Sequence, residues 1–401
     1  MSDKEIIYLD NNATTRVAPE VLEAMMPFFG DRYGNPSSIY RFGGMIRRHV
    51  ERAREQVAAL IGASPEEIFF TSCGTESDNM ALKGFFCGHT AADCARARII
   101  TTAVEHPAVR NTARYINQKL GVPLTELPVN GDGMLFFDAD GGQGEPACSP
   151  INAIDQNTIV SIMWANNETG VVFPIAQIAE AVKARGGWFH TDAVQAVGKV
   201  PVDVRAAPVD MLAISGHKLH APKGIGAAFF RAGTPARPLL HGGHQEGGAR
   251  AGTENVPYII GLGAACELAA KRMDDESTRV RALRDRLEHG LLTGCAGAKL
   301  NGDAGARLPN TLNISFENIE GEAILLHLDA AGIAASSGSA CTTGALEPSH
   351  VMMAMGVPYN YAHSSIRFSL SVYNTDSDVD KVLAVMPGIV GKLRDLSPFV
   401  A

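Results

Sequence analysis

Five polar segments of the sequence each follow directly on a short apolar run. Together they contain hydroxyl groups beside a glycine turn, a carboxylate, an imidazole, amides and an amine. Any one segment has an ordinary explanation as a solvated loop or a helix cap, but five in one chain are harder to explain in that way. The segments are Ser72-Cys73-Gly74-Thr75-Glu76-Ser77, Val104-Glu105-His106-Pro107, Asn166-Asn167-Glu168, Thr191-Asp192-Ala193-Val194-Gln195 and Gly216-His217-Lys218-Leu219-His220.

This inventory fits pyridoxal phosphate, a cofactor that needs a lysine, an acidic residue and a phosphate site. Lys218 is the strongest candidate for the Schiff-base lysine, and Lys223 is its nearest competitor. The turn that opens a helix at Gly74 suits a phosphate, because a helix N-terminus presents free N–H groups and the positive end of its dipole. Neither G-x-x-x-x-G-K-S/T nor G-x-G-x-x-G occurs, so a nucleotide is not supported.

A second candidate site is Cys341, in the segment from Ala334 to Gly344. A cysteine is ordinarily a buried apolar residue, but this segment contains no large apolar side chain. Small residues give a chain few packing anchors, so we expect a mobile loop with an accessible thiol, the setting of a nucleophile. The other six cysteines, at 73, 87, 94, 148, 266 and 295, form no C-x-x-C pair and are interpreted as structural.

The elements that must position these residues alternate between short apolar strands and amphipathic helices, which predicts an α/β fold with a mainly parallel sheet. Ligands of such sheets collect at the carboxyl ends of the strands. A long helix followed by a Gly-rich turn within 262–301, and an α+β pattern after them, predict a smaller second lobe with a boundary near 260. The segment 138–150 is expected to be an exposed loop. The expected strands are 68–71, 98–102, 158–164, 187–190, 210–215 and 226–231.

Composition narrows the class of protein further. The 401 residues are 46% hydrophobic and 19% charged, which allows a large core, and the net charge of −8 offers no basic footprint for nucleic acid. The start MSDKEIIYLD has no apolar signal core, and the apolar stretch over 256–270 is broken by Glu267. We therefore expect a cytoplasmic protein with no signal peptide, no membrane span and no nucleic-acid partner.

From these residues the chain resembles the pyridoxal-phosphate-dependent cysteine desulfurases, a group within the class-V aminotransferases. The resemblance runs from Tyr8 to Pro398, and WANNETG, GHKLHAPKG and the ending SPFVA resemble the nitrogen-fixation (NifS-like) branch. Its motifs are YLDNNATT at 8–15, GNPSS at 34–38, TSCGTESDN at 71–79, VEHPAV at 104–109, NNETG at 166–170, HTDAVQAVGK at 190–199, SGHKLHAPKG at 215–224, RAGTEN at 250–255 and SSGSACTTG at 336–344.

The resemblance implies the fold of the type I pyridoxal-phosphate transferases and a homodimer. It implies a large cofactor-binding domain over 16–260 and a small domain formed by 1–15 and 261–401, which carries the cysteine loop. Lys218 would be the Schiff-base lysine, and Asp192 would pair with the pyridine nitrogen. Gln195 and Asn167 would lie near the ring hydroxyl, and His106 would stack on the ring. The phosphate would be held by Gly74, Thr75, Ser215 and His217, joined by Thr253 from the partner subunit.

For the reaction, the resemblance implies that L-cysteine is converted to L-alanine and that its sulfur passes to Cys341 as a persulfide. Arg367 would grip the substrate carboxylate, a bidentate task suited to guanidinium, with Asn167 also at the substrate. Lys218 and His106 would transfer protons. The sulfur would go to an iron–sulfur scaffold protein, with nitrogenase clusters as the expected destination, and Cys341 is a candidate transient iron–sulfur ligand through its persulfide.

Other functions stay open at this point. An aminotransferase or a cysteine lyase would share the cofactor motifs but would need no mobile thiol such as Cys341. A metal-binding protein would rest on HGGH at 241–244 and HKLH at 217–220, which lack a nearby third ligand. The chain departs from the branch pattern in a longer segment at 131–156 and in Glu246-Gly247-Gly248-Ala249, which lacks extra arginines before Arg250.

Overall fold

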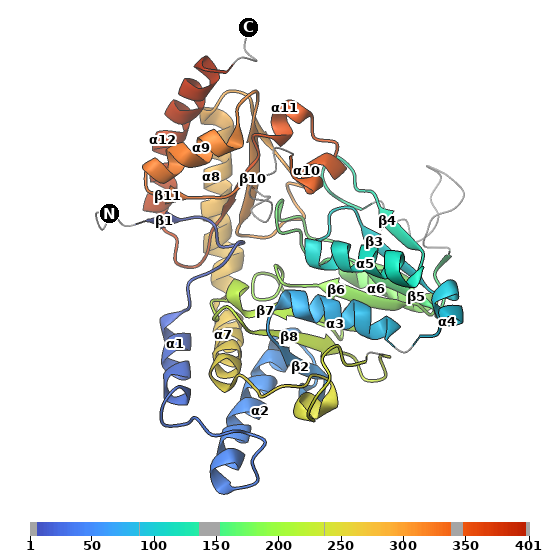
Figure 1. Cartoon of the computed structure of the whole chain (residues 1–401). Helices are drawn as coiled ribbons and strands as arrows, with labels where there is room; N and C mark the ends of the chain where they lie inside the picture. Colours follow the sequence, from blue (N-terminus) through green and yellow to red (C-terminus); the bar gives the residue numbers. More distant parts are fainter. Residues whose placement is uncertain (1–5, 88, 136–152, 236, 338–347, 398–401) are drawn as a thin grey trace.

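The computed structural model describes residues 6–87, 89–135, 153–235, 237–337 and 348–397 (Figure 1). Within them, seven strands form a central sheet in the order β2-β8-β7-β6-β5-β3-β4. Strand β8 runs antiparallel to both of its neighbours and the other pairings are parallel, so the sheet is mainly parallel. The strands are β2 (Ile68–Thr71), β3 (Arg98–Thr102), β4 (Leu124–Leu127), β5 (Thr158–Ser161), β6 (Trp188–Asp192), β7 (Met211–Ser215) and β8 (Gly226–Phe230).

Helices cover both faces of this sheet, because successive strand side chains point to opposite faces. Ile99 and Ile159 pack with α3 (Gly74–Phe86) and α5 (Pro107–Leu120), whereas Ile100 and Val160 pack in the cluster that holds the other helices. Those helices are α2 (Arg41–Ile61), α6 (Ile175–Ala184) and α7 (Val256–Asp275). The short α1 (Pro19–Met25) lies against α7, and α4 (Ala91–Arg96) precedes β3.

A second core surrounds a smaller antiparallel sheet in the order β12-β10-β9, formed by β9 (Ala298–Leu300), β10 (Thr311–Phe316) and β12 (Ile366–Ser369). Strand β1 (Ile7–Tyr8) pairs in parallel with β11 (Ile333–Ala334) on the same side of the molecule (Figure 1). The N-terminal segment therefore belongs to this lobe. The helices of this core are α8 (Arg281–Gly294), α9 (Gly321–Ala330) and α12 (Asp376–Asp395). The buried residues of α10 (His350–Ala354) and α11 (Tyr359–Ala362) pack in the large-lobe core instead.

The division into domains at 16–260 and 1–15 with 261–401 stays a prediction. Along the chain, Leu9 packs in the small-lobe core and Ala18 in the large-lobe core. The long helical stretch passes from one core to the other, since Cys266 packs with the large lobe and Val280 with the small lobe. A π-helical turn at Glu276–Val280 joins α7 to α8 there.

Several element boundaries differ from the sequence expectations. The strand expected over 158–164 ends at Ser161, and the strand expected over 187–190 continues to Asp192. The long helix expected within 262–301 is α7, the π turn and α8, and it begins earlier than expected, at Val256, and ends at Gly294. Strand β4 was not expected. The loop expected over 138–150 lies outside the described residues.

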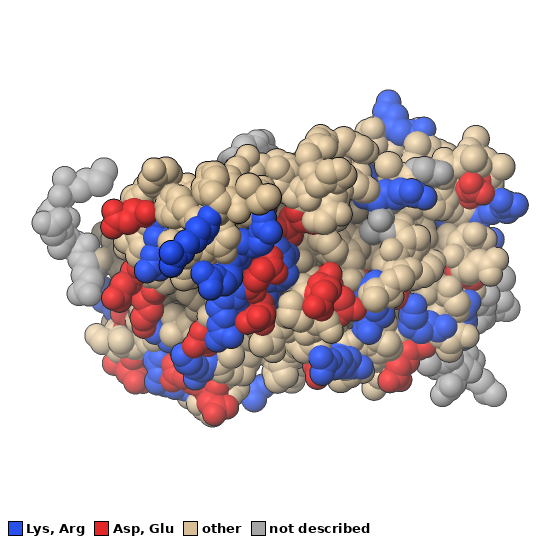
Figure 2. All heavy atoms as spheres, turned by 90° about the horizontal axis from the view of Figure 1, so that it is seen from below, with Lys and Arg blue, Asp and Glu red and all other residues tan. Residues whose placement is uncertain are grey.

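On the face that lies below the view of Figure 1, basic and acidic side chains are interspersed (Figure 2). Ion pairs of surface helices include Arg52–Glu55 within α2, at 3.2 Å, and Arg272–Glu20 between α7 and α1, at 2.9 Å. Exposed pairs of this kind contribute about 1 kcal/mol or less to stability. Among the described helices, none is both long enough and apolar enough to span a membrane.

Candidate active site

The carboxyl ends of five strands meet at one cavity of about 400 Å³. The residues after β2, β3, β5, β6 and β7 all contribute to its wall, as does the N-terminal segment and Arg367 of β12. The polar segments singled out in the sequence therefore come together in space. The lining residues are Asn12, Ala13, Cys73, Gly74, Thr75, Asp78, His106, Met163, Ala165, Asn167, Asp192, Val194, Gln195, Ser215, His217, Lys218 and Arg367.

Lys218 lies in a single 3-10 turn that follows β7. Its Nζ donates to the main-chain carbonyl oxygen of Asn12 and, at 2.7 Å, to that of Ala13. The N-terminal segment is fixed beside this turn, since Thr15 donates to the carbonyl of His217 through its N–H at 2.9 Å and its hydroxyl at 3.0 Å. Two backbone carbonyls thus hold the amine at the cavity wall.

Asp192 is the last residue of β6 and is buried. Its Oδ1 accepts the N–H of Val194 at 2.9 Å, and none of the hydrogen bonds among the described residues uses Oδ2. Burial raises the pKa of Asp192, while His106, when it is protonated, and the charge of Lys218 oppose that shift. A buried carboxylate with one oxygen facing a cavity is suited to pair with a cationic N–H of a ligand.

His106 is the N-cap residue of α5, and its Nδ1 accepts the N–H of Ala108 at 3.1 Å. Burial lowers the pKa of His106, with the positive charge of Lys218 acting in the same direction and Asp192 against it. A neutral ring whose Nδ1 accepts must carry its proton on Nε2. The imidazole therefore presents Nε2–H as a donor at the cavity.

One end of the cavity has the features of an anion site. Helix α3 begins at Gly74, and its N-cap residue Cys73 makes no side-chain cap, so the first N–H groups of the helix have no partner from that side chain. A Cβ at Gly74 would lie 2.8 Å from Cγ2 of Val194, so only glycine fits there. Ser215 and His217 line the same cavity, and Nδ1 of His217 lies 3.2 Å from the Thr14 hydroxyl.

His217 is held in its neutral form. Burial is the largest cause that lowers its pKa, to about 4, and the nearby Lys218 and Lys223 act in the same direction. A neutral imidazole can donate one hydrogen bond to an anion without adding a full charge to a site that already holds Lys218.

These residues fit pyridoxal phosphate. The uncapped N-terminus of α3 with Thr75, Ser215 and His217 would hold the phosphate, Asp192 the pyridine nitrogen, and Lys218 the aldehyde carbon. When bound, the cofactor supplies an electron sink that stabilises negative charge at the substrate Cα.

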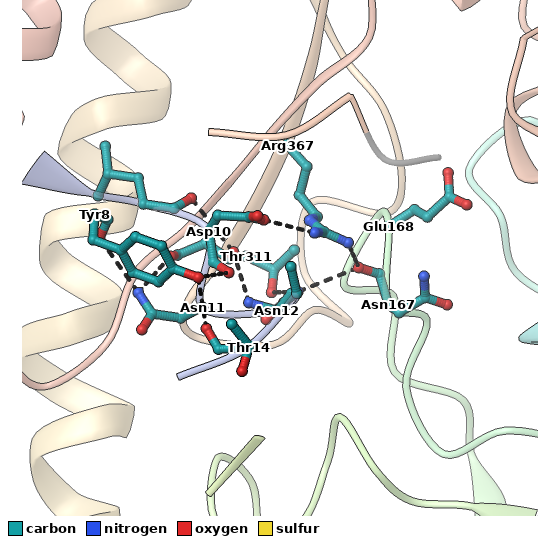
Figure 3. Close-up of polar contacts among 12 residues, drawn as sticks. Tyr8, Asp10, Asn11, Asn12, Thr14, Asn167, Glu168, Thr311 and Arg367 are labelled. Atoms are coloured by element: carbon teal, nitrogen blue, oxygen red, sulfur yellow. Dashed lines mark hydrogen bonds and ion pairs between the residues drawn. The ribbon is translucent and has the colours of Figure 1, made fainter. Parts of the chain in front are cut away.

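Gln195 lies on the cavity wall but its amide is engaged with the protein. Its Nε2 donates to the Asn12 carbonyl at 3.0 Å, and its Oε1 accepts from Nζ of Lys199 at 2.8 Å. The Asn12 side chain continues this network, since its Nδ2 donates to the Thr311 hydroxyl at 2.8 Å and to the Asn167 carbonyl at 3.3 Å. The large lobe, the N-terminal segment and β10 are joined here (Figure 3).

Arg367 is buried at the opposite side of the same network (Figure 3). One terminal nitrogen donates to the Asn167 carbonyl and the other to Oδ1 of Asp10, both at 2.8 Å. Its Nε has no hydrogen-bond partner among the described residues. Arg367 lines the cavity, and its guanidinium keeps one N–H without a partner, so it is suited to receive a carboxylate.

Sequence reasoning assigned no site role to several polar residues at and near the cavity. Asp78 lines the cavity from α3, fully buried, and its Oδ1 lies 3.5 Å from Nε2 of His190. Burial raises the pKa of Asp78, and the negative charges of Asp192 and Glu105 raise it further. Glu105 is buried too, and burial raises its pKa to about 8. The Asp10-Asn11-Asn12 run after an apolar pair was the available signal for the N-terminal segment.

Two expected site residues are not at this cavity. Thr253 is exposed and lies at a different cavity with Ser72 and Arg250, and its place in the cavity of a partner subunit stays a prediction. Cys341 lies outside the described residues. Ser336, the first residue of the same motif, is described and pairs with the Arg367 backbone. Among the described residues, no group of three or more His, Cys, Asp or Glu side chains is arranged to hold a metal ion, and this includes the histidines at 217, 220, 241 and 244.

A model of the class-V aminotransferase family matches residues 7–382, and the chain belongs to this family. Its similar relatives within the family are cysteine desulfurases. The cysteine desulfurase of Trichormus azollae is 55% identical over 98% of this chain and 95% of its own length. The cysteine desulfurase NifS of Azotobacter vinelandii is 52% identical over 98% of this chain and 94% of its own length.

A solved structure of a NifS-like protein superimposes with a TM-score of 0.87 at 40% identity, covering 97% of this chain and all of that one. The resemblance inferred from the motifs and the expected fold, a large mainly parallel sheet with a smaller α+β part, are both confirmed.

Proposed function

We propose that this chain is a pyridoxal-phosphate-dependent cysteine desulfurase that converts L-cysteine to L-alanine and supplies the sulfur for iron–sulfur clusters. The observation that carries the proposal is the meeting of Lys218, Asp192 and Arg367 at one cavity, in a chain about 55% identical to enzymes of that name. An amine, a buried carboxylate and a guanidinium are what an amino-acid substrate and this cofactor require.

The described residues divide the work as follows. Arg367 binds the substrate carboxylate with the N–H groups that are not bonded to Asp10 or Asn167. The Lys218 amine, once freed by the substrate, takes the proton from the substrate Cα. His106 donates a proton from Nε2 and is reprotonated there, because the Ala108 N–H keeps Nδ1 as the acceptor. Asp192 keeps a protonated ring nitrogen in place through its cavity-facing oxygen.

Cys341 is the proposed sulfur acceptor, on the motif SSGSACTTG alone. Its thiolate forms an S–S bond to the substrate sulfur while the substrate C–S bond breaks. The electron pair of that bond stays with the substrate carbon, which takes up a proton, so the products are alanine and an enzyme persulfide. We propose an iron–sulfur scaffold protein as the next acceptor, nitrogenase clusters as the destination, and transient binding of the cluster at Cys341.

We also propose a homodimer, since the segment that contains GNPSS exposes several large apolar side chains. Tyr33 is 78% exposed, Ile39 is fully exposed and Tyr40 is 57% exposed. Side chains of this size gather at interfaces between subunits. In such a dimer Thr253 would complete the phosphate site of the partner subunit.

The function is tested by supplying the purified full chain with pyridoxal phosphate and L-cysteine. We expect one alanine formed for each sulfur transferred, and a persulfide on the protein after a single turnover without reductant. Release of pyruvate and ammonia instead of alanine would identify a lyase, and exchange of the amino group with an oxo acid would identify an aminotransferase.

A further inference from the structure

Lys199 is a buried lysine with no assigned role. It follows β6 by seven residues and is 6% exposed. Its Nζ donates to Oε1 of Gln195 at 2.8 Å and to Oδ1 of Asn12 at 3.4 Å. Burying an ammonium group costs free energy, so packing alone does not explain why a lysine occupies this position.

The contacts with Lys199 and with the Asn12 carbonyl together set which way the Gln195 amide faces. An ammonium group can only donate hydrogen bonds, so the amide oxygen must point at Lys199. The amide NH₂ then points the other way, to the Asn12 carbonyl at 3.0 Å, which also accepts from Lys218. Gln195 therefore offers the remaining N–H of its amide, and not its oxygen, at the cavity beside Lys218.

We propose that Lys199 is a positioning residue that fixes Gln195 as a hydrogen-bond donor to the anionic ring oxygen of the cofactor linked to Lys218. This inference rests on the proposed function. A donor at that oxygen favours its ionised form, and the positive charge of Lys199 favours it further. Both effects ease the loss of the proton from the cofactor-linked Lys218 nitrogen.

A buried carboxyl group near Lys199 helps to stabilise its ammonium group. Glu276, in the π turn between α7 and α8, is buried with its Oε2 unpartnered among the described residues. Lys199, Lys218 and Glu276 line one small cavity of about 30 Å³, which is room for about one water molecule. Burial lowers the pKa of Lys199, and Lys218 and Arg367 add to that shift, whereas the carboxylate of Glu276 opposes it and favours the ammonium form.

The test uses full-length protein loaded with pyridoxal phosphate, and follows the pH midpoint of its visible absorbance rather than turnover. In Lys199→Met we expect the midpoint to rise by about 1 pH unit, a shift typical of one lost charge or hydrogen bond. Lys223→Met, which removes an exposed lysine five residues after Lys218, is the matched control and should leave the midpoint close to that of the wild type.

A double-mutant cycle with Gln195→Leu separates positioning from a bare charge effect. If Lys199 acts through Gln195, Lys199→Met should shift the midpoint much less in the Gln195→Leu background than in the wild type. An equal shift in both backgrounds, or none in either, would overturn the inference. Cofactor content and thermal unfolding show whether each variant is folded, and Lys199→Gln serves if Lys199→Met is not. Absence of the visible band from the wild-type protein would instead refute the proposed function, and this inference with it.

Discussion

Lys218 and Gln195 donate to the same acceptor, the main-chain carbonyl oxygen of Asn12. This carbonyl is fixed from the other side, because the Asn12 side chain is bonded to Thr311, Asn310 and Lys199. The position of the Lys218 amine therefore depends on a segment more than 200 residues away in the chain. To react with a cofactor, the Lys218 amine must leave the carbonyls of Asn12 and Ala13. The N-terminal segment must then keep its conformation without the hydrogen bonds from Lys218.

Replacing Lys218 should remove the site of cofactor attachment. In Lys218→Ala we expect no visible absorbance from a lysine-linked cofactor, and activity reduced to background, because no other described amine lines that cavity. Absorbance spectra of protein purified with excess pyridoxal phosphate check this. Lys223→Ala is the control, and loss of the band there with retention in Lys218→Ala would move the attachment to Lys223.

Replacing Arg367 by lysine should weaken substrate binding. Lysine keeps the charge but loses the planar fork, so one charge-assisted hydrogen bond to the carboxylate is lost, and we expect KM for L-cysteine to rise about 10-fold or more. Steady-state kinetics should show this with a smaller effect on kcat. Arg286→Lys, on an exposed arginine paired with Asp376, should leave KM unchanged. An unchanged KM in Arg367→Lys would place the carboxylate elsewhere.

Glu105 makes folding stability depend on pH. Its folded-state pKa of about 8 lies above the ordinary value of 4.5, because burial raises it. The folded protein therefore holds this proton more tightly than the unfolded chain, and the contribution of Glu105 to the unfolding free energy falls as the pH rises from about 4.5 to about 8. Glu105→Gln has no proton to lose. Its stability relative to the wild type should rise over that range by at least about 1 kcal/mol.

Denaturant unfolding of both proteins at about pH 5 and about pH 8.5 measures the difference. Glu23→Gln, at an exposed position on α1, is the control and should track the wild type at both values. A stability difference between Glu105→Gln and the wild type that does not change with pH would show that Glu105 stays ionised in the folded protein.

Removing the Asn12 side chain should loosen the Lys218 site without removing the carbonyl. Asn12→Ala leaves the buried hydroxyl of Thr311 without its donor, and we expect a loss of about 1–3 kcal/mol of stability. We also expect weaker retention of pyridoxal phosphate, measured by dialysis and absorbance. Asn11→Ala removes a neighbouring amide that bonds to the Ser369 carbonyl at 2.9 Å, and it should lower stability while cofactor retention stays near the wild-type value.

Cys341 should matter only after the cofactor is in place. In Cys341→Ala we expect the wild-type absorbance but no protein persulfide and no transfer of sulfur to a scaffold, because no thiol receives it. Alkylation and mass measurement of the protein after one turnover check this. A persulfide found on Cys73, which lines the cavity, would assign the acceptor role to that residue.

The sequence predicts where β2 and β3 begin and end, because their signal is local. Strands β2 and β3 have the expected bounds, since each is a short apolar run that ends at polar residues. Strand β4 was not predicted because its four residues, Leu-Thr-Glu-Leu, lie at the sheet edge and are partly exposed, so they do not form a continuous apolar run. The polar segments that follow five strands could be placed together because parallel strands end at one edge.

What the sequence could not predict is set by contacts between distant residues. Asn12 and Asp10 meet Lys218 and Arg367 across 206 and 357 residues, and no local pattern signals such pairing. Asp78 was missed for a different reason. A polar residue on an amphipathic helix is usually exposed, and only the packing of α3 against β6 and His190 places it at the cavity.

The pairing of the N-terminal segment with β12 also has a consequence for how the protein is made. Asn12 emerges from the ribosome early, but Ser369, whose hydroxyl accepts its N–H at 2.9 Å, emerges more than 350 residues later. The large sheet has all of its strands once Phe230 is synthesised, whereas Arg367, which lines the same cavity as Lys218, is synthesised later, with β12. The cavity therefore gains its full lining only after β12 has been made.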